Sequence, residues 1–198
     1  MATQEERRRV TRRRIVDAAR DLFLRQGIEA TSTEALLEAA GVSRGAMYHH
    51  FASRNDIVAT VYEEEASAAI ARAVDRMPEG ASAPERLVTG CLAWLDEVSS
   101  PEVARLLIED GPAALGWQRC RQIEERYSLG RVRAELETAV GTAETRVPSV
   151  RLAARLLNAA LGEAALIMTG AADRAAVRSD IETTLRALVS GLMDADAR

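Results

Sequence analysis

The stretch TSTEALLEAAGVSRGAMYHHF, residues 31–51, decides how the N-terminal part of this chain folds. It predicts two short helices joined by a tight turn. Thr31 and Glu34 have the spacing of a capping box, which favours a helix start at this point. Gly41 can adopt the positive φ that ends a helix, and Ser43 can cap the next one. The residues expected on the buried side of the first helix are Leu36, Leu37 and Ala40. Together these features predict a helix-turn-helix.

The second short helix has one face that carries no large aliphatic side chain. Met47 and Phe51 lie one turn apart and are expected to point into the core, so Gly45 and His49 point away from it. Such a helix can enter the DNA major groove with its N-terminus first. There Arg44, at the tip, can bond a guanine edge, worth about 1–3 kcal/mol of base discrimination. The residues expected to contact DNA bases or phosphates are Ser32, Thr33, Ser43, Arg44, Gly45, Tyr48, His49, His50 and Arg54.

Residues 14–63 resemble the DNA-binding module of TetR-family (tetracycline-repressor-like) transcriptional regulators. The matching run is AGVS (40–43), Gly45, Tyr48, HF (50–51) and SR (53–54), without a gap. The resemblance implies a homodimer with one DNA module per subunit. It also implies a C-terminal domain that binds a small-molecule effector and dimerises through its last two helices. In such proteins the effector tilts the fourth helix and changes the distance between the two recognition helices.

The composition of the whole chain is that of a helical protein. Of its 198 residues, 47% are hydrophobic and 28% are charged, which favours a sizeable folded core. Alanine (37 residues) and leucine (20) dominate the apolar set, whereas aromatic residues make up 4%. Alanine and leucine are strong helix formers, and a sheet would need more β-branched and aromatic residues. The chain is therefore expected to be all-α.

Charge is distributed unevenly along the chain. Residues 1–55 contain ten arginines and seven acidic residues, whereas residues 56–198 contain sixteen and twenty-three. A basic front and an acidic remainder suggest that a polyanion is bound at the front. The arginine-rich run 7–14 is expected to reach DNA phosphates or the minor groove, with a solvated surface as the alternative.

Helix-breaking residues divide the chain into about nine helices. Residues 1–55 are expected to form the DNA-binding module, with a fourth helix over about 54–76 as the connection. Residues 77–198 are expected to form the ligand-binding and dimerisation domain. Within this domain a break is expected at Asp110–Pro112, followed by one long helix over 117–140.

The C-terminal domain offers weaker signals than the helix-turn-helix. Its two tryptophans either line an effector pocket or pack in the core. Asn158 and Glu163 lie in an apolar helix but on different faces, so at most one easily contacts a ligand. The residues expected to line the pocket are Trp94, Leu107, Trp117, Asn158 and Met168. Those expected at the dimer interface, with ordinary core packing as the alternative, are Leu152, Leu156, Ala160, Gly162, Val177, Ile181, Leu185 and Leu188.

The sequence gives no reason to expect a metal, a cofactor or a membrane segment. His49 and His50 point about 100° apart on a helix, so they cannot share one ion. Cys91 and Cys120 fit no metal-ligand spacing and are expected to be reduced thiols, buried or idle. The N-terminus lacks the apolar run of a signal peptide, and the apolar region 152–168 is interrupted by polar residues. A cytoplasmic protein is expected.

These features predict a ligand-responsive transcriptional regulator. It is expected to be a repressor that binds a palindromic DNA operator as a homodimer and is released by a small-molecule effector. The alternative is a small all-α enzyme, or a helical ligand-binding protein without operator binding. A glycine-rich phosphate loop, a chelating cluster and a nucleophile–base pair are all missing from the sequence, which favours the regulator.

Overall fold

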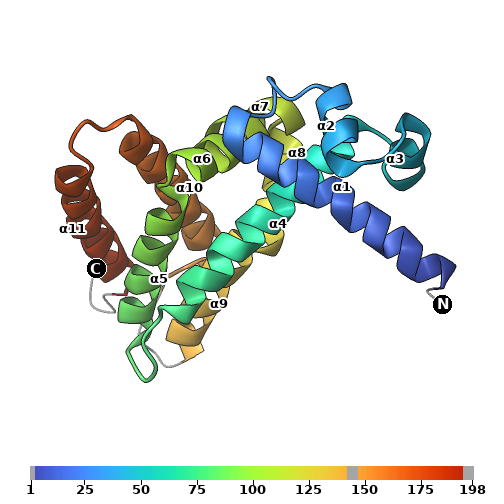
Figure 1. The fold of residues 1–198 in the computed structure, drawn as a ribbon. Coiled ribbons are helices and arrows are strands. Elements are labelled where there is room, and N and C mark those ends of the chain that lie inside the picture. The colour runs from blue at the N-terminus through green and yellow to red at the C-terminus, as the bar shows by residue number, and fades with distance from the viewer. Residues whose placement is uncertain (1–2, 142–146, 194–198) are drawn as a thin grey trace. The chain divides into compact units, whose positions relative to one another are not determined.

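The computed structural model describes residues 3–141 and 147–193, and every regular element in these ranges is a helix (Figure 1). The predicted all-α fold is confirmed. If α6, η1 and α7 are taken as one continuous helix, the described ranges contain ten helices. The elements are α1 (Gln4–Gln26), α2 (Thr33–Ala40), α3 (Arg44–His50), α4 (Arg54–Asp75), α5 (Ala83–Val98), α6 (Pro101–Ala104), η1 (Arg105–Asp110), α7 (Gly111–Leu115), α8 (Trp117–Arg126), α9 (Ser128–Gly141), α10 (Val150–Gly170) and α11 (Arg174–Met193).

The break predicted at Asp110–Pro112 is wrong. Helix α6, the π-helical turn η1 and α7 follow one another without interruption from residue 101 to 115. Pro112 is tolerated because it lies in the first turn of α7, where its missing N–H is not needed. The helical run ends instead at Gly116, whose φ of 78° favours glycine.

The single helix predicted over 117–140 is also wrong, because the chain forms α8 and α9 with a break at Tyr127. The Tyr127 N–H donates to the Glu124 carbonyl at 3.2 Å, a bond that tightens the end of α8. The Ser128 hydroxyl donates to the same carbonyl at 3.3 Å. Local bonds of this kind compete with the regular helical ladder.

By contact the chain divides into two compact units: residues 1–65 together with 105–120, and residues 66–104 together with 121–198. The boundaries expected from the sequence, at residues 55 and 77, stay a prediction. The contacts nevertheless assign 105–120 to the N-terminal unit, whereas the sequence placed this segment in the second domain.

The N-terminal unit is built around α1. Ile15 and Phe23 lie two turns apart on α1 and are completely buried, so one face of the helix forms the core. Leu36 of α2 and Met47 of α3 are buried in the same unit. Helix α1 ends at Gly27, as predicted, with a φ of 89°. The core thus fixes both helices of the predicted helix-turn-helix against α1.

The segment 105–115 binds the end of α1 within the same unit. Arg105 Nη2 donates to the Leu24 carbonyl at 2.6 Å, and Asp110 Oδ2 accepts from the Ile28 N–H at 3.0 Å. One side chain therefore satisfies a free carbonyl at the C-terminus of α1, and the other satisfies an amide of the following turn. A Cβ at Gly111 would lie 2.4 Å from the Tyr62 ring, so this position needs glycine.

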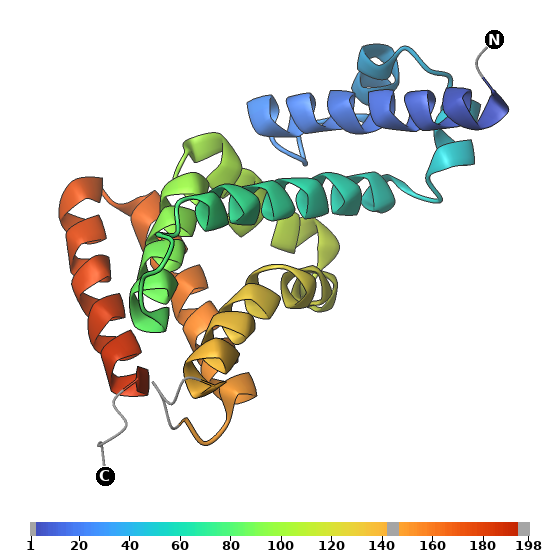
Figure 2. The same cartoon turned by 90° about the horizontal axis from the view of Figure 1, so that it is seen from below.

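The second unit is a bundle in which α5, α9, α10 and α11 pack on one another. Figures 1 and 2 both show α5, α10 and α11 side by side. Leu95 and Val98 of α5 and Leu136 of α9 are completely buried, as is Ala154 of α10. The core is therefore formed by aliphatic side chains, in keeping with the low aromatic content.

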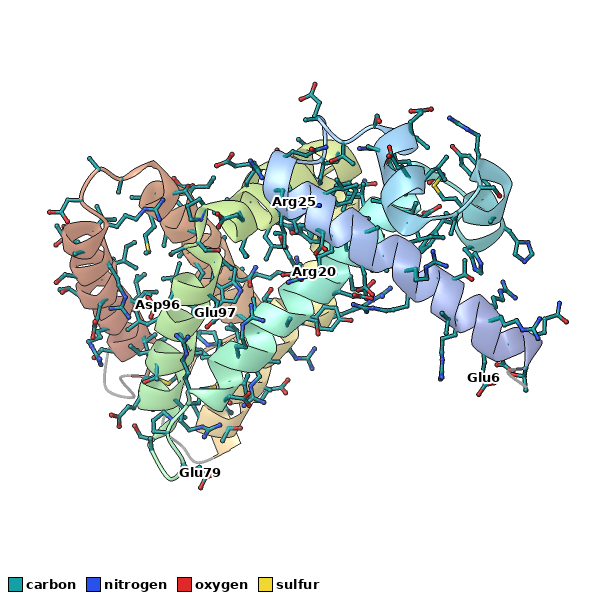
Figure 3. All side chains as sticks on the ribbon, in the orientation of Figure 1. Glu6, Arg20, Arg25, Glu79, Asp96 and Glu97 are labelled. Carbon is teal, nitrogen blue, oxygen red and sulfur yellow. The ribbon has the colours of Figure 1, made fainter. Side chains whose placement is uncertain are left out.

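Ion pairs fix other elements of this unit to α5. Asp96 and Glu97, labelled in Figure 3, are neighbours near the end of α5. Arg178 of α11 donates to Asp96 through Nε at 2.6 Å and Nη2 at 2.9 Å. Arg72 of α4 and Arg76, just after it, both pair with Glu97. The bidentate Arg178–Asp96 geometry is the strongest form of such a pair.

Helix α10 is the one described helix that is long and apolar enough to cross a membrane, and 39% of its most apolar window is buried. The core helix of a soluble bundle meets the same criterion. Because α10 contacts α5, α6, α9 and α11, we interpret it as the central helix of the second unit.

Candidate DNA-binding surface and ligand pocket

Helices α2 and α3 form the predicted turn, with one correction at its start. Gly41 has φ 60° and ψ 42°, the left-handed conformation expected of it, and Ser43 Oγ caps α3 by accepting from the Ala46 N–H. The capping box predicted at Thr31 is wrong, because Ser32 is the N-cap of α2. The Thr31 hydroxyl is buried and donates instead to the Gly27 carbonyl at 2.7 Å.

The outward face of α3 is open. Met47 is buried, as predicted, whereas Arg44, Gly45 and His49 are exposed and Tyr48 is 44% exposed. A Cβ built at Gly45 meets no atom within 4 Å, so another backbone can approach closely there. Side chains that can donate hydrogen bonds thus flank a bare stretch of helix, as a helix in a major groove requires.

Arg44 is held by a neighbour from α2. Its guanidinium pairs with Glu34, and both side chains are exposed. An exposed pair of this kind contributes about 0–1 kcal/mol, so it orients Arg44 without preventing a new contact. The Glu34 carboxylate thus has a different role from the capping predicted for it.

Arg54, predicted to contact phosphate, has an intramolecular role in this structure. Its Nη2 donates to the Ile28 carbonyl at 2.5 Å and to the Thr31 carbonyl at 2.9 Å. The guanidinium also lies 5.9 Å from the centre of the Phe23 ring. These contacts attach the start of α4 to the turn between α1 and α2, and a phosphate role for Arg54 stays a prediction.

His50 lies at the C-terminal end of α3 and is half-buried. Its Nδ1 atom is buried and has no hydrogen-bond partner in the described residues. Burial lowers the pKa of His50, and the positive charges of His49, Arg8 and Arg12 lower it further. The folded protein therefore disfavours protonation of this imidazole.

This environment predicts a pH dependence of stability that His50 controls. In the unfolded chain an imidazole with the ordinary pKa of 6.5 takes up a proton that the folded imidazole resists. The free energy of unfolding should therefore fall as the pH drops through the unfolded-state pKa. His50→Gln should flatten this dependence between about pH 5.5 and 7, measured by urea denaturation. Equal slopes for the two proteins would contradict this assignment.

The arginine-rich run is helical, because α1 begins at Gln4. Contact of this helical run with DNA phosphates or the minor groove stays a prediction. Within the chain, Arg14 donates to the Ala40 carbonyl at 2.7 Å and so satisfies a free carbonyl at the C-terminus of α2. Arg7 and Arg9 are exposed at the start of the helix, where phosphate contact remains the prediction.

The second unit contains a pocket with an empty volume of about 510 Å³. Of the predicted ligand residues, Trp94 and Asn158 lie on its wall, whereas Leu107, Trp117 and Met168 do not. Trp117 is 66% exposed. The residues that line the pocket are Ile70, Ala73, Val74, Met77, Arg86, Leu87, Gly90, Cys91, Trp94, Ser128, Arg131, Val132, Glu135, Asn158 and Leu161.

The pocket contains a charge cluster around a buried carboxylate that could not be predicted from the sequence. Glu135 is 5% exposed and pairs with Arg86 of α5 and Arg131 of α9. The carboxylate raises the pKa of Arg86, so this guanidinium stays charged. The spacing of four residues between Arg131 and Glu135 was visible in the sequence, but the 49-residue separation from Arg86 gave no signal.

Both cysteines are buried, reduced thiols, in keeping with the prediction. Burial raises the pKa of the Cys91 thiol to about 12, so this pocket residue remains protonated and unreactive. Among the residues that the structure describes, no group of His, Cys, Asp and Glu side chains could hold a metal ion.

Helices α10 and α11 present large apolar side chains to solvent. Leu152, Leu156 and Leu188, predicted at the dimer interface, are exposed, and Leu166 and Ile167 are further exposed members of α10. Of the other predicted interface residues, Leu185 is buried within the chain, whereas Ala160, Gly162, Val177 and Ile181 are half-buried. Whether any of these residues contacts a second copy stays a prediction.

A capped pair of short helices whose second helix has a bare outward face defines a helix-turn-helix DNA-binding protein. The family model described as bacterial regulatory proteins, tetR family, matches residues 15–61. A second family model, described as tetracyclin repressor-like, C-terminal domain, matches residues 84–192. The chain belongs to the TetR family of transcriptional regulators, which are not enzymes.

Curated relatives match parts of the chain. TetC of transposon Tn10 from Escherichia coli is 28% identical over 134 residues, 66% of each protein. The regulator AcrR from Shigella flexneri is 43% identical over 53 residues, 27% of this chain and 25% of AcrR. The chain thus aligns with about two thirds of TetC but only a quarter of AcrR.

Solved structures share the whole fold. A TetR-family regulator from Pectobacterium atrosepticum has a TM-score of 0.79 at 23% identity, over 98% of both chains. RolR, solved in complex with resorcinol, has a TM-score of 0.76 at 16% identity, over 98% of this chain and 92% of RolR.

Proposed function

We propose that the protein is a cytoplasmic repressor that binds a two-fold symmetric DNA operator as a homodimer and is released by a small molecule. The observation that carries the proposal is the open face of α3, where Arg44, Gly45 and Tyr48 are exposed on a helix that the core holds in place through Met47. Family membership supports DNA binding, and the points below support the dimer and the effector.

The exposed face of α10 supports a second copy of this chain as the partner. Leu152, Leu156, Ala159, Glu163 and Leu166 are all exposed and follow one another at alternating intervals of four and three residues. This is the spacing of a helix that packs along another helix. Large apolar side chains gathered on one face mark an interaction surface, and the last two helices are where the family resemblance predicts dimerisation.

Dimerisation makes DNA binding sensitive to geometry. Two recognition helices must meet half-sites about 34–36 Å apart at the same time. When both are docked, the second binding event is intramolecular, and avidity exceeds that of one module by about 10²–10⁴-fold. A ligand that changes the spacing of the two helices removes this gain, so a small displacement is sufficient for release.

The pocket of the second unit supports a small-molecule effector. Its wall is largely apolar and carries a few polar groups, which is the composition typical of ligand sites. RolR, which shares the fold, was solved with resorcinol bound. We therefore place the effector of this protein in the pocket between α4, α5, α9 and α10.

Arg44→Ala tests the DNA-reading role of α3. The variant should lose about 1–3 kcal/mol of discrimination at one base position per half-site, because the bidentate guanine contact is removed. Competition of operator variants in fluorescence anisotropy measures the loss. Glu34→Gln is the matched control: it frees the same guanidinium and should leave the base preference intact.

Equal base preference for Arg44→Ala and the parent would contradict this role. The alternative, a helical ligand-binding protein without operator binding, predicts that neither protein retains DNA selectively. It also predicts binding without the steep salt dependence that released counterions produce.

A further inference from the structure

The lining of the ligand pocket carries a net positive charge on an apolar background. Among the described residues that line it, only Arg86, Arg131 and Glu135 are charged, which leaves one positive charge in excess. Glu135 is 5% exposed, whereas the side chains of Arg86 and Arg131 are 28% and 40% exposed, so the excess positive charge lies on side chains that a ligand from solvent can reach. A pocket of this kind attracts an anion and repels a cation.

Arg131 keeps a donor in reserve after pairing with Glu135, whereas the third nitrogen of Arg86, Nη1, donates to the Pro78 carbonyl at 3.4 Å. Arg86 Nε and Nη2 reach the carboxylate oxygens at 3.2 Å each, and Arg131 Nη2 donates at 2.7 Å. The Nε atom of Arg131 is buried and has no partner in the described residues. Buried donors normally have an acceptor, so a missing acceptor here points to a ligand.

Two further polar groups on the wall lack partners. Asn158 and Trp94 both line the pocket, and neither side chain has a hydrogen bond to any described residue. An amide and an indole N–H placed in this way can orient the polar end of a ligand.

Much of the remaining wall is aliphatic. Ile70, Val74 and Met77 come from α4 and the turn after it, and Leu87 and Leu161 from α5 and α10. A Cβ at Gly90 would lie 3.2 Å from the Met77 sulfur, so glycine gives this methionine its place on the wall. A compact apolar body fits against such a surface.

We propose that the effector is a small carboxylic acid, bound as its monoanion with the carboxylate toward Arg131 and the apolar body against the aliphatic wall. This inference rests on the proposed function only in giving the ligand a regulatory role. The chemical class of the ligand follows from the pocket alone. A monoanion neutralises the one excess positive charge of the pocket. A neutral ligand leaves this charge uncompensated, and a protonated amine raises it to two.

The test uses the full chain and two matched series: octanoate, octanamide and octylamine; and phenylacetate, phenylacetamide and phenethylamine. Trp94 on the pocket wall is the reporter. Since Trp117 is 66% exposed and lies off the pocket, Trp117→Phe leaves Trp94 as the sole indole. We expect each carboxylate to change the Trp94 fluorescence with an affinity at least about tenfold above that of its amide, because its hydrogen bonds are charge-assisted. The amines should not bind.

Variants of the charge cluster should act in opposite directions. Arg131→Gln should weaken carboxylate binding at least about tenfold and leave the amides unchanged, whereas Arg131→Lys should retain part of the selectivity. Glu135→Gln removes the negative charge and should tighten carboxylate binding, an effect that loss of folding cannot imitate. Val74→Trp, which fills the pocket, should abolish binding of every probe.

The proposal is overturned if the carboxylates bind no better than the amides, including the case in which no probe binds. It is also overturned if Glu135→Gln and Arg131→Gln shift carboxylate affinity in the same direction. Operator binding is measured separately by fluorescence anisotropy. Carboxylate selectivity in a chain that does not bind operator DNA would overturn the proposed repressor and support the ligand class.

Discussion

Replacing Leu156 by arginine should convert the protein from a dimer into a monomer and lower its operator affinity by about 10²–10⁴-fold. Leu156 is 64% exposed within the chain, so the substitution should leave the fold of one subunit intact. In a dimer packed along α10, however, it would bury a guanidinium without a partner, which is strongly unfavourable. Sedimentation velocity measures the mass, and anisotropy with operator DNA measures the affinity.

A matched control separates this effect from a general one. Val140 is 43% exposed on α9, a helix outside the predicted interface, and Val140→Arg should remain dimeric with full affinity. A dimeric Leu156→Arg protein that binds its operator normally would show that the interface lies elsewhere.

Phe23→Ala should lower the stability of the N-terminal unit by about 3–5 kcal/mol, the usual cost of removing a buried aromatic side chain. Phe23 is completely buried, and its ring lies next to the Arg54 guanidinium. Its own carbonyl accepts from the Gly27 N–H at 2.9 Å at the end of α1. The substitution therefore leaves a cavity where α1, α4 and the following turn meet.

Hydrogen exchange followed by mass spectrometry measures this loss locally. Peptides from α1 to α3 should exchange much faster in Phe23→Ala than in the parent, because the opening free energy of this unit falls. Leu22→Ala, at the half-buried neighbouring position, is the control and should change exchange far less. Equal effects of the two substitutions would contradict the packing described for Phe23.

The parts of the fold that could be predicted from the sequence are those set by local chemistry. Gly41 and Ser43 act within a few residues of their own positions, and Met47 follows helical periodicity. Their conformations and burial match the prediction for that reason. The helix-turn-helix is thus encoded almost entirely in one short stretch.

Contacts between distant residues could not be predicted in this way. Arg14 donates a hydrogen bond to a backbone carbonyl at the end of α2. Arg105 and Asp110 bind backbone groups at the end of α1 from 81 and 82 residues away. An arginine that binds a carbonyl far along the chain looks in the sequence like any exposed arginine. Arg54 was interpreted as a phosphate contact for the same reason.

The residues that line the pocket could be predicted only in part. Trp94 and Asn158 were expected in it because they are scarce or polar in an apolar helix, and both lie on its wall. Leu107 and Met168 were also expected there but are buried outside the pocket. The sequence does not distinguish an apolar side chain that lines a pocket from one that packs in the core. The burial of Glu135 could not be predicted either, because its partner Arg86 lies 49 residues away.

In the proposed dimer, two copies of α3, one from each subunit, bind one operator together. Selection of DNA from a random pool by the purified protein, followed by sequencing, tests it most directly. If two subunits bind together, the selected sequence should be two-fold symmetric, with half-sites centred about 10 base pairs, or a multiple of this, apart. Enrichment of a single asymmetric half-site, or of no sequence at all, would contradict it.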